Sequence, residues 1–169
     1  MKVEKISAIA EIISSVAIVI TLIYLTVETR QNTEALNAQS RESILASSQA
    51  ELFFLTERPE LAVLMTKPDR LSVEENIQLD AFLTALFRVR EYSWLQYQAG
   101  VIDEVQWSTE LAVIQSLLST DRSRLWWNKL GRLYVSAEFA TFLSDLIRNQ
   151  STSDDLWKAT FDWSDREAQ

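Results

Sequence analysis

Few residue types in this chain can carry out acid–base, nucleophilic or metal chemistry. The sequence contains no histidine and no cysteine, which removes the commonest general base, the commonest zinc ligand and any thiol or disulfide. Its serines therefore have no histidine to activate them. Asp154 and Asp155 are adjacent, but no third ligand is evident. We expect no catalytic residues, no metal and no cofactor, and the chain is predicted not to be an enzyme.

Glu11 is the ionisable residue with the most unusual position. It is the only charged residue in the apolar run from residue 6 to residue 27. An ionisable side chain within a membrane span is costly and is by default a candidate functional group. Two interpretations stay open. The carboxylate either reaches the headgroups or a neighbouring helix in a structural role, or it handles protons or cations.

Three further charged residues interrupt an apolar helical pattern. Arg88, Arg90 and Glu91 form this candidate buried charge cluster. Arg88 and Glu91 are three residues apart, a spacing at which side chains on one helix can pair. If the helix is central, at least one charge is partly buried and needs a partner. A structural ion pair is the favoured interpretation, and a ligand carboxylate bound to an arginine is the alternative.

The apolar run 6–27 is long enough to cross a bilayer as a helix, so the lipid bilayer is the first expected partner. The run is too long for the apolar part of a signal peptide, and no small-residue cleavage site follows it. Lys2, Lys5 and the free amine precede it, whereas Arg30 and then Arg41 follow it. Under the positive-inside rule this slight excess favours a cytoplasmic N-terminus and an extracytoplasmic domain.

Small and hydroxylated residues recur along one side of this predicted span. Their alternating steps of three and four keep them on one helical face, opposite bulky aliphatic residues. In a bilayer, small residues let helices approach closely. The span is therefore predicted to form a homo-oligomer, although chance use of small residues would give the same pattern. The predicted packing face consists of Ser7, Ala10, Ser14, Ala17 and Thr21.

The rest of the chain predicts an all-α fold. Glycine and proline occur only twice each, which suits helices and not β-structure or phosphate-binding loops. Residues 28–43 continue the helical pattern but are polar nearly all round, as expected of a helical stalk. Apolar residues return in 44–149, the predicted all-helical domain, which is a small bundle. Residues 150–169 form an acidic tail that is either loosely attached or docked through its aromatic residues.

Capping signals divide the predicted domain into helices. Ser72 and Glu75 form a capping box, and Gly100 suits the end of the long helix that follows. Asp103 precedes Gln106 by three residues and starts the next helix. Further starts are predicted near Pro59, at Thr120 or Asp121, and at Ser136.

The six tryptophans lie mostly on apolar faces of the predicted helices, so core packing is favoured over a ligand cage or a membrane belt. Trp126 and Trp127 are adjacent, and we expect that they do not both face one core. One of them should then be exposed or contact a partner. The six are Trp94, Trp107, Trp126, Trp127, Trp157 and Trp163.

Four segments follow one another between residues 6 and 147: LIYLTVETRQNT, RPELAVLM, FRVREYSWLQYQAGVIDEVQW and RLWWNKLGRLYVSAEFATFL. In this order they resemble a widespread group of bacterial single-span membrane proteins of unknown function. Arg58 replaces the polar residue that is usual before the first proline of that pattern. The resemblance implies the bacterial inner membrane and an all-helical domain, and it brings no activity.

These observations predict a membrane-anchored helical interaction or scaffold module that self-associates or serves another membrane protein. Two alternatives stay open. One is a small oligomeric channel or transporter-like assembly that uses Glu11. The other is a sensor that binds a small apolar ligand in its tryptophan-rich domain. The net charge of −8 and the lack of a basic face predict no nucleic-acid partner.

Overall fold

The protein was analysed as a computed structural model that describes the backbone of residues 2–161 and the side chains of residues 11–154 and 157–159. The described residues form helices and connecting loops without a strand, which confirms the all-α prediction. The chain divides into two compact units, Met1–Ser40 and Arg41–Gln169. The helix α1 (Lys2–Glu57) contributes to both units, and each unit is described by itself.

The first unit is the N-terminal part of α1. Within the described residues, α1 holds the one segment that is long and apolar enough to cross a membrane, with a mean hydropathy of 2.0 in its most apolar window. Hydroxyl groups in this segment donate to carbonyls four residues earlier, as from Thr21 to Ala17 (2.9 Å) and from Thr26 to Leu22 (2.7 Å). These bonds satisfy the hydroxyls within the helix itself.

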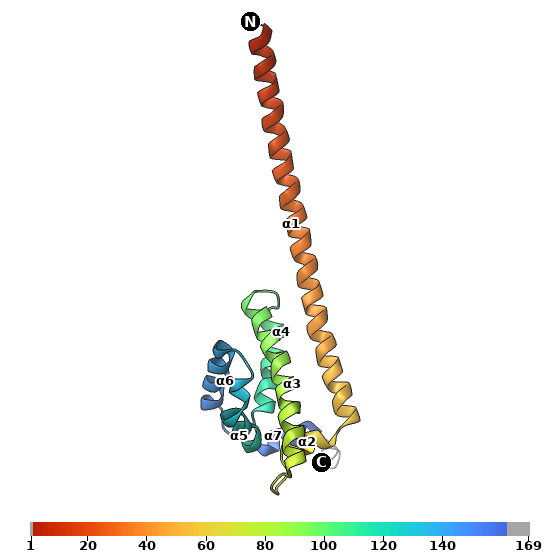
Figure 1. The fold of residues 1–169 in the computed structure, drawn as a ribbon, viewed down its shortest axis with the longest axis vertical. Coiled ribbons are helices and arrows are strands. Elements are labelled where there is room, and N and C mark those ends of the chain that lie inside the picture. Colours follow the sequence, from red (N-terminus) through yellow and green to blue (C-terminus); the bar gives the residue numbers. More distant parts are fainter. Residues whose placement is uncertain (1, 162–169) are drawn as a thin grey trace, which may run out of the picture. The chain divides into compact units, whose positions relative to one another are not determined.

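The second unit contains the end of α1 and the remaining helices. They are α2 (Glu60–Leu64), α3 (Val73–Gln98), α4 (Glu104–Leu117), α5 (Asp121–Lys129), a 3₁₀ turn (Gly131–Leu133), α6 (Ala137–Asn149) and α7 (Asp154–Phe161). The central pair, α3 and α4, lie side by side (Figure 1). The helix α6 packs on both, because the Phe142 ring contacts those of Trp94 and Trp107 at centroid distances of 6.2 and 5.9 Å.

Most of the predicted helix starts are confirmed with their capping bonds. The Ser72 side chain accepts from the Glu75 amide (3.1 Å), and the Glu75 carboxylate accepts from the Ser72 amide (2.8 Å). Asp103 and Gln106 make the same reciprocal pair at the start of α4. Gly100 follows α3 with φ of 70°, a conformation that favours glycine at a helix end.

The start of α6 differs in detail from the prediction. Ser136 does occupy the position before the helix, but its side chain makes no capping bond. Its amide instead donates to a carboxylate oxygen of Glu91 (2.6 Å), which ties the start of α6 to α3. A tertiary acceptor has thus replaced the local cap.

The expectation that Trp126 and Trp127 do not share one core is wrong, since both are buried. The ring of Phe87 on α3 lies 5.5 Å from the Trp126 ring and 5.7 Å from the Trp127 ring, so one aromatic residue contacts both. The Trp126 indole donates to Asp80 (2.7 Å), which satisfies its buried N–H. The short helix α5 therefore buries adjacent side chains that both contact one ring.

The C-terminal segment is docked in its described part. Trp157 on α7 is buried, and its indole N–H donates to the Ala62 carbonyl of α2 (2.9 Å). The Ser153 amide donates to the Ser119 carbonyl (2.9 Å) just before α7 begins. Of the two alternatives for the tail, docking through an aromatic residue is thus observed, whereas Trp163 lies outside the described residues.

Gly131 provides the space that the two tryptophan rings occupy. A Cβ atom at this position would lie 2.5 Å from Cζ3 of Trp126 and 2.8 Å from Cε3 of Trp127. We expect Gly131→Ala to lower the free energy of unfolding by about 1–3 kcal/mol, the usual cost of overpacking a core. Urea unfolding followed by near-ultraviolet circular dichroism measures the change. Leu133→Ala, at an exposed position in the same turn, is the matched control, and equal stability of the two variants would contradict this packing.

Candidate functional site

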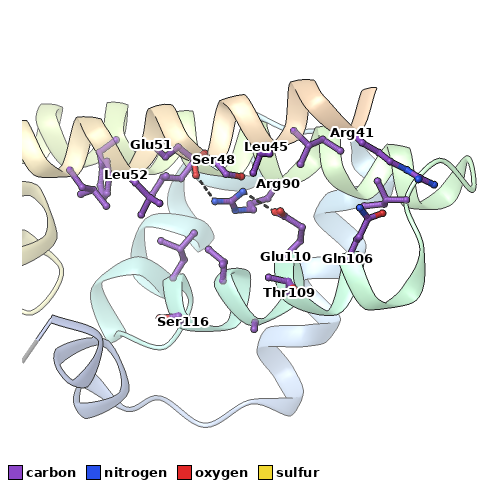
Figure 2. A pocket seen from close by; sticks show the side chains of 18 of the residues that line it. Arg41, Leu45, Ser48, Glu51, Leu52, Arg90, Gln106, Thr109, Glu110 and Ser116 are labelled. Atoms are coloured by element: carbon purple, nitrogen blue, oxygen red, sulfur yellow. Dashed lines mark hydrogen bonds and ion pairs between the residues drawn. The ribbon is translucent and has the colours of Figure 1, made fainter. Parts of the chain in front are cut away.

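The second unit contains a groove of about 960 Å³ between the end of α1, α3 and α4. Figure 2 shows Leu45, Ser48 and Leu52 of α1 along one wall and Thr109 and Ser116 of α4 along the other. The lining is mainly apolar. It consists of Arg41, Glu42, Ile44, Leu45, Ser48, Glu51, Leu52, Leu55, Phe82, Leu86, Arg90, Ile102, Gln106, Thr109, Glu110, Ala112, Val113, Ser116, Leu117 and Trp157.

The residue types on the two walls explain why the groove exists. The helices α3 and α4 pack closely, whereas α1 makes no equally close approach to any other helix. Ser48 of α1 faces a wall on which α4 presents Thr109, Ala112 and Ser116. These side chains are too short to fill the space between two helices. Larger side chains at these positions would close the groove in the way that ordinary helix packing does.

Arg90 bridges the two walls from the floor of the groove. Its side chain is 5% exposed, and its NH1 donates to Glu110 of α4 at 2.8 Å. Its NH2 donates to Glu51 of α1 in a short ion pair. Figure 2 shows the guanidinium between the two carboxylates. The side chains of Glu51 and Glu110 are 15% and 13% exposed, so the three residues form a largely buried ion cluster.

The ion cluster has more negative than positive charge, because one guanidinium stands between two carboxylates. Burial raises the pKa of the Glu51 carboxyl; Arg90 acts in the opposite direction, and the nearby Glu110 adds to the increase. Two buried atoms of the cluster, Glu51 Oε1 and Arg90 Nε, have no hydrogen-bond partner among the described residues. The cluster is therefore only partly satisfied by its own members.

The predicted charge cluster separates into two places in the structure. Arg88 and Glu91 pair as their spacing indicates, with Arg88 NH1 2.7 Å from Glu91 Oε2. Glu91 is buried, but the Arg88 side chain is 60% exposed, so it is not part of a buried cluster. This pair holds α3 to the start of α6 through Ser136, away from the groove. Only Arg90 of the three predicted residues lines the groove.

The sequence interpretation missed Glu51 and Glu110, although a signal for both was present. Glu51 falls at steps of four, three and four on the same helical face as Ile44, Ser48 and Leu55. Glu110 stands three residues after Trp107 and four before Ile114, on the apolar face of α4. An acid in the apolar stripe of an amphipathic helix predicts a buried partner.

The side chains predicted as functional in the first unit are described only in part. Glu11, Ser14, Ala17 and Thr21 have exposed side chains on α1. The side chains of Ser7 and Ala10, also predicted for the packing face, lie outside the described residues, as does that of Asp155. Among the described side chains, no group of three or more acidic residues is arranged to hold a metal ion.

Comparison of the chain with known protein families, with characterised proteins and with solved structures finds no match. The resemblance to bacterial single-span proteins therefore stays a prediction from the sequence.

The ion cluster gives a direct stability prediction. Arg90→Met leaves two buried carboxylates without their cation, and we expect a loss of about 3–5 kcal/mol in the free energy of unfolding. Replacing the whole cluster (Glu51→Leu, Arg90→Met and Glu110→Leu together) removes the unpaired charges and should recover most of that loss. Urea unfolding of the full chain in mild detergent measures both. A triple variant less stable than Arg90→Met would show that the charges themselves are not the cause.

Glu51 also predicts a pH dependence. Because its pKa is higher in the folded chain than the ordinary value of 4.5, the folded state binds its proton more tightly than the unfolded state. Its contribution to stability is therefore greatest below pH 4.5 and is lost as pH rises through the folded pKa. The stability of Glu51→Gln relative to the wild type should increase over that range, by at most about 1.4 kcal/mol per pH unit. Paired urea titrations at successive pH values test this, and a constant or falling difference would contradict it.

Proposed function

We propose that this protein is a membrane-anchored binding module whose helical domain takes up a small, largely apolar molecule in the groove between α1, α3 and α4. The groove itself carries the proposal. Its volume of about 960 Å³ falls within the usual range for small-molecule sites, and such sites combine apolar walls with a few convergent polar groups. The ion cluster of Glu51, Arg90 and Glu110 supplies those groups. Of the functions expected from the sequence, this is the sensor.

The anchor in this proposal is the apolar segment of α1. Its large aliphatic side chains are exposed in the first unit, including Ile12 at 64% and Ile20 at 61%. A row of exposed aliphatic residues on an isolated helix is unstable in water but suits acyl chains. We place the protein in the bacterial inner membrane as a single-pass protein, as the sequence resemblance implies.

Binding without catalysis is the function we assign to the groove. The guanidinium of Arg90 is held by two carboxylates, and the hydroxyls that line the groove belong to Ser48, Thr109 and Ser116. Thr109 donates to the Val105 carbonyl (3.3 Å), and among the described residues no hydrogen bond joins any of the three hydroxyls to a carboxylate, as activation of a nucleophile would require. The groups fit recognition of a ligand rather than its conversion.

Self-association is a second candidate function, and one observation in the second unit favours it. Near its end, α1 exposes Leu52 at 67% and Phe53 at 70%. Large adjacent apolar side chains at a surface are typical of contacts with another protein. A second copy of the chain or another membrane protein would cover them. The channel alternative gains no such support from the exposed side chain of Glu11.

The proposed function is tested with the neutral apolar dye N-phenyl-1-naphthylamine and the full chain in phosphatidylcholine nanodiscs. We expect a saturable rise in dye fluorescence above that of nanodiscs without protein. Ser48→Phe places a ring in the groove and should weaken binding at least about tenfold, whereas Ala50→Phe, on the opposite side of the same helix, should leave it unchanged. Dye binding that is absent, or equally affected by both substitutions, would refute the proposal.

A further inference from the structure

We infer that the ligand of the groove is an organic cation, with one ammonium group held at the Glu51–Arg90–Glu110 cluster and an apolar body along the helix walls. This inference rests on the proposed function, because it names the class of ligand for the same groove. Three observations lead to it: the balance of charge in the lining, the way Arg90 is already used, and the apolar surface next to the cluster.

The lining has one more carboxylate than it has cations. Its carboxylates belong to Glu42, Glu51 and Glu110, and its guanidinium groups to Arg41 and Arg90. Glu42 and Arg41 are exposed, and Arg41 donates to the Val101 carbonyl (2.9 Å). The excess charge therefore falls on the buried cluster, where it is screened least. The whole chain is acidic as well, with a net charge of −8, which favours cations over anions as they approach.

The use of Arg90 argues against an anionic ligand. Both terminal nitrogens of its guanidinium already donate to carboxylates, NH1 to Glu110 and NH2 to Glu51. The remaining N–H groups include Nε, which has no partner among the described residues, but a carboxylate or phosphate bound there would lie beside two negative groups. Like charges at such distances repel strongly in a buried setting. The alternative from the sequence, a ligand carboxylate bound to one of these arginines, is therefore disfavoured at Arg90, which already pairs with Glu51 and Glu110.

A cation would instead complete the cluster. Glu51 Oε1 is buried and accepts no hydrogen bond from any described residue. Glu51 lines the groove, and the terminal torsion of a glutamate is broad, so rotation of this carboxyl group can present an oxygen to a ligand there. An ammonium group offers three N–H donors and one positive charge. It would supply the missing donor and bring the two carboxylates and the two cations into balance.

Binding of the cation should depend on pH, because the groups that face Glu51 affect its protonation. They are Arg90 from α3 and Glu110 from α4, while α7 contributes the uncharged Trp157 to the same groove. Burial raises the pKa of the Glu51 carboxyl, which means that a proton competes with the ligand for the same charge. Binding of the cation should therefore weaken as pH falls through the pKa of Glu51.

The walls next to the cluster suit an alkyl or aryl group. Leu52 and Leu55 come from α1, Phe82 and Leu86 from α3, and Val113 from α4. Leu52 and Val113 are exposed side chains of the groove. A ligand that covers them therefore removes apolar surface from water. A chain of about eight carbons is a suitable probe for a groove of this size.

The test compares three probes with the same chain and different head groups: octylammonium, 1-octanol and octanoate. Each displaces the naphthylamine dye from the full chain in phosphatidylcholine nanodiscs at pH 7.5, with protein-free nanodiscs subtracted. We expect octylammonium to bind about tenfold more tightly than octanol, the ratio that one charge-assisted hydrogen bond gives. Octanoate should bind more weakly than octanol.

Two isosteric variants locate the effect. Glu110→Gln removes the excess carboxylate charge and should reduce the preference for octylammonium over octanol to less than about threefold. Octanol binding by this variant checks that its groove is intact. Glu138→Gln removes the same charge from an exposed position on α6 and should leave the preference unchanged.

The outcomes are distinguishable. Equal affinity for octylammonium and octanol, a preference for octanoate, or a preference that survives Glu110→Gln would each overturn the cation inference while leaving an apolar binding groove. Absence of binding by the dye and by all three probes would overturn the proposed function as well.

Discussion

The guanidinium of Arg90 is the interaction on which the second unit depends. It lies on α3, is almost fully buried, and pairs with Glu51 of α1 and Glu110 of α4. The helices α3 and α4 pack closely on each other, but α1 does not pack closely on either. The ion cluster connects α1 to the helical pair, in addition to apolar contacts such as the stacked rings of Phe54 and Phe82. A buried ion pair adds little net stability in general, and here its effect is to fix the position of a helix.

The rest of the second unit makes this arrangement rigid. The rings of Trp126 and Trp127 pack on Phe87, in space that Gly131 leaves free. Glu91, the neighbour of Arg90, holds the start of α6 to α3. The floor of the groove is thus tied to α5 and α6 by aromatic and polar contacts. A floor held by these contacts, with an ion cluster that joins the two walls, suits a binding groove, because preorganised groups lose less entropy when a ligand binds.

Local signals in the sequence predicted the helices well. The capping box at Ser72, its counterpart at Asp103 and the glycine at position 100 each act within one helical turn, so these signals can be read from neighbouring residues. The site was predicted only in part. Arg90 could be chosen because it interrupts an apolar helical pattern, but its partners come from residues 39 positions before it and 20 positions after it. The identity of the two carboxylates that pair with Arg90 depends on how three helices pack. The periodicity of the sequence does not predict this packing.

We expect Arg90 to hold α1 at a fixed distance from α4 across the groove. The chain lacks cysteine, so spin labels can be placed at Ala50→Cys on α1 and Ser108→Cys on α4, both exposed positions. Double electron–electron resonance of the full chain in nanodiscs then measures the distance between the two helices. The account predicts one narrow distribution that broadens or shifts when Arg90 is replaced by methionine. An unchanged narrow distribution in that variant would contradict it.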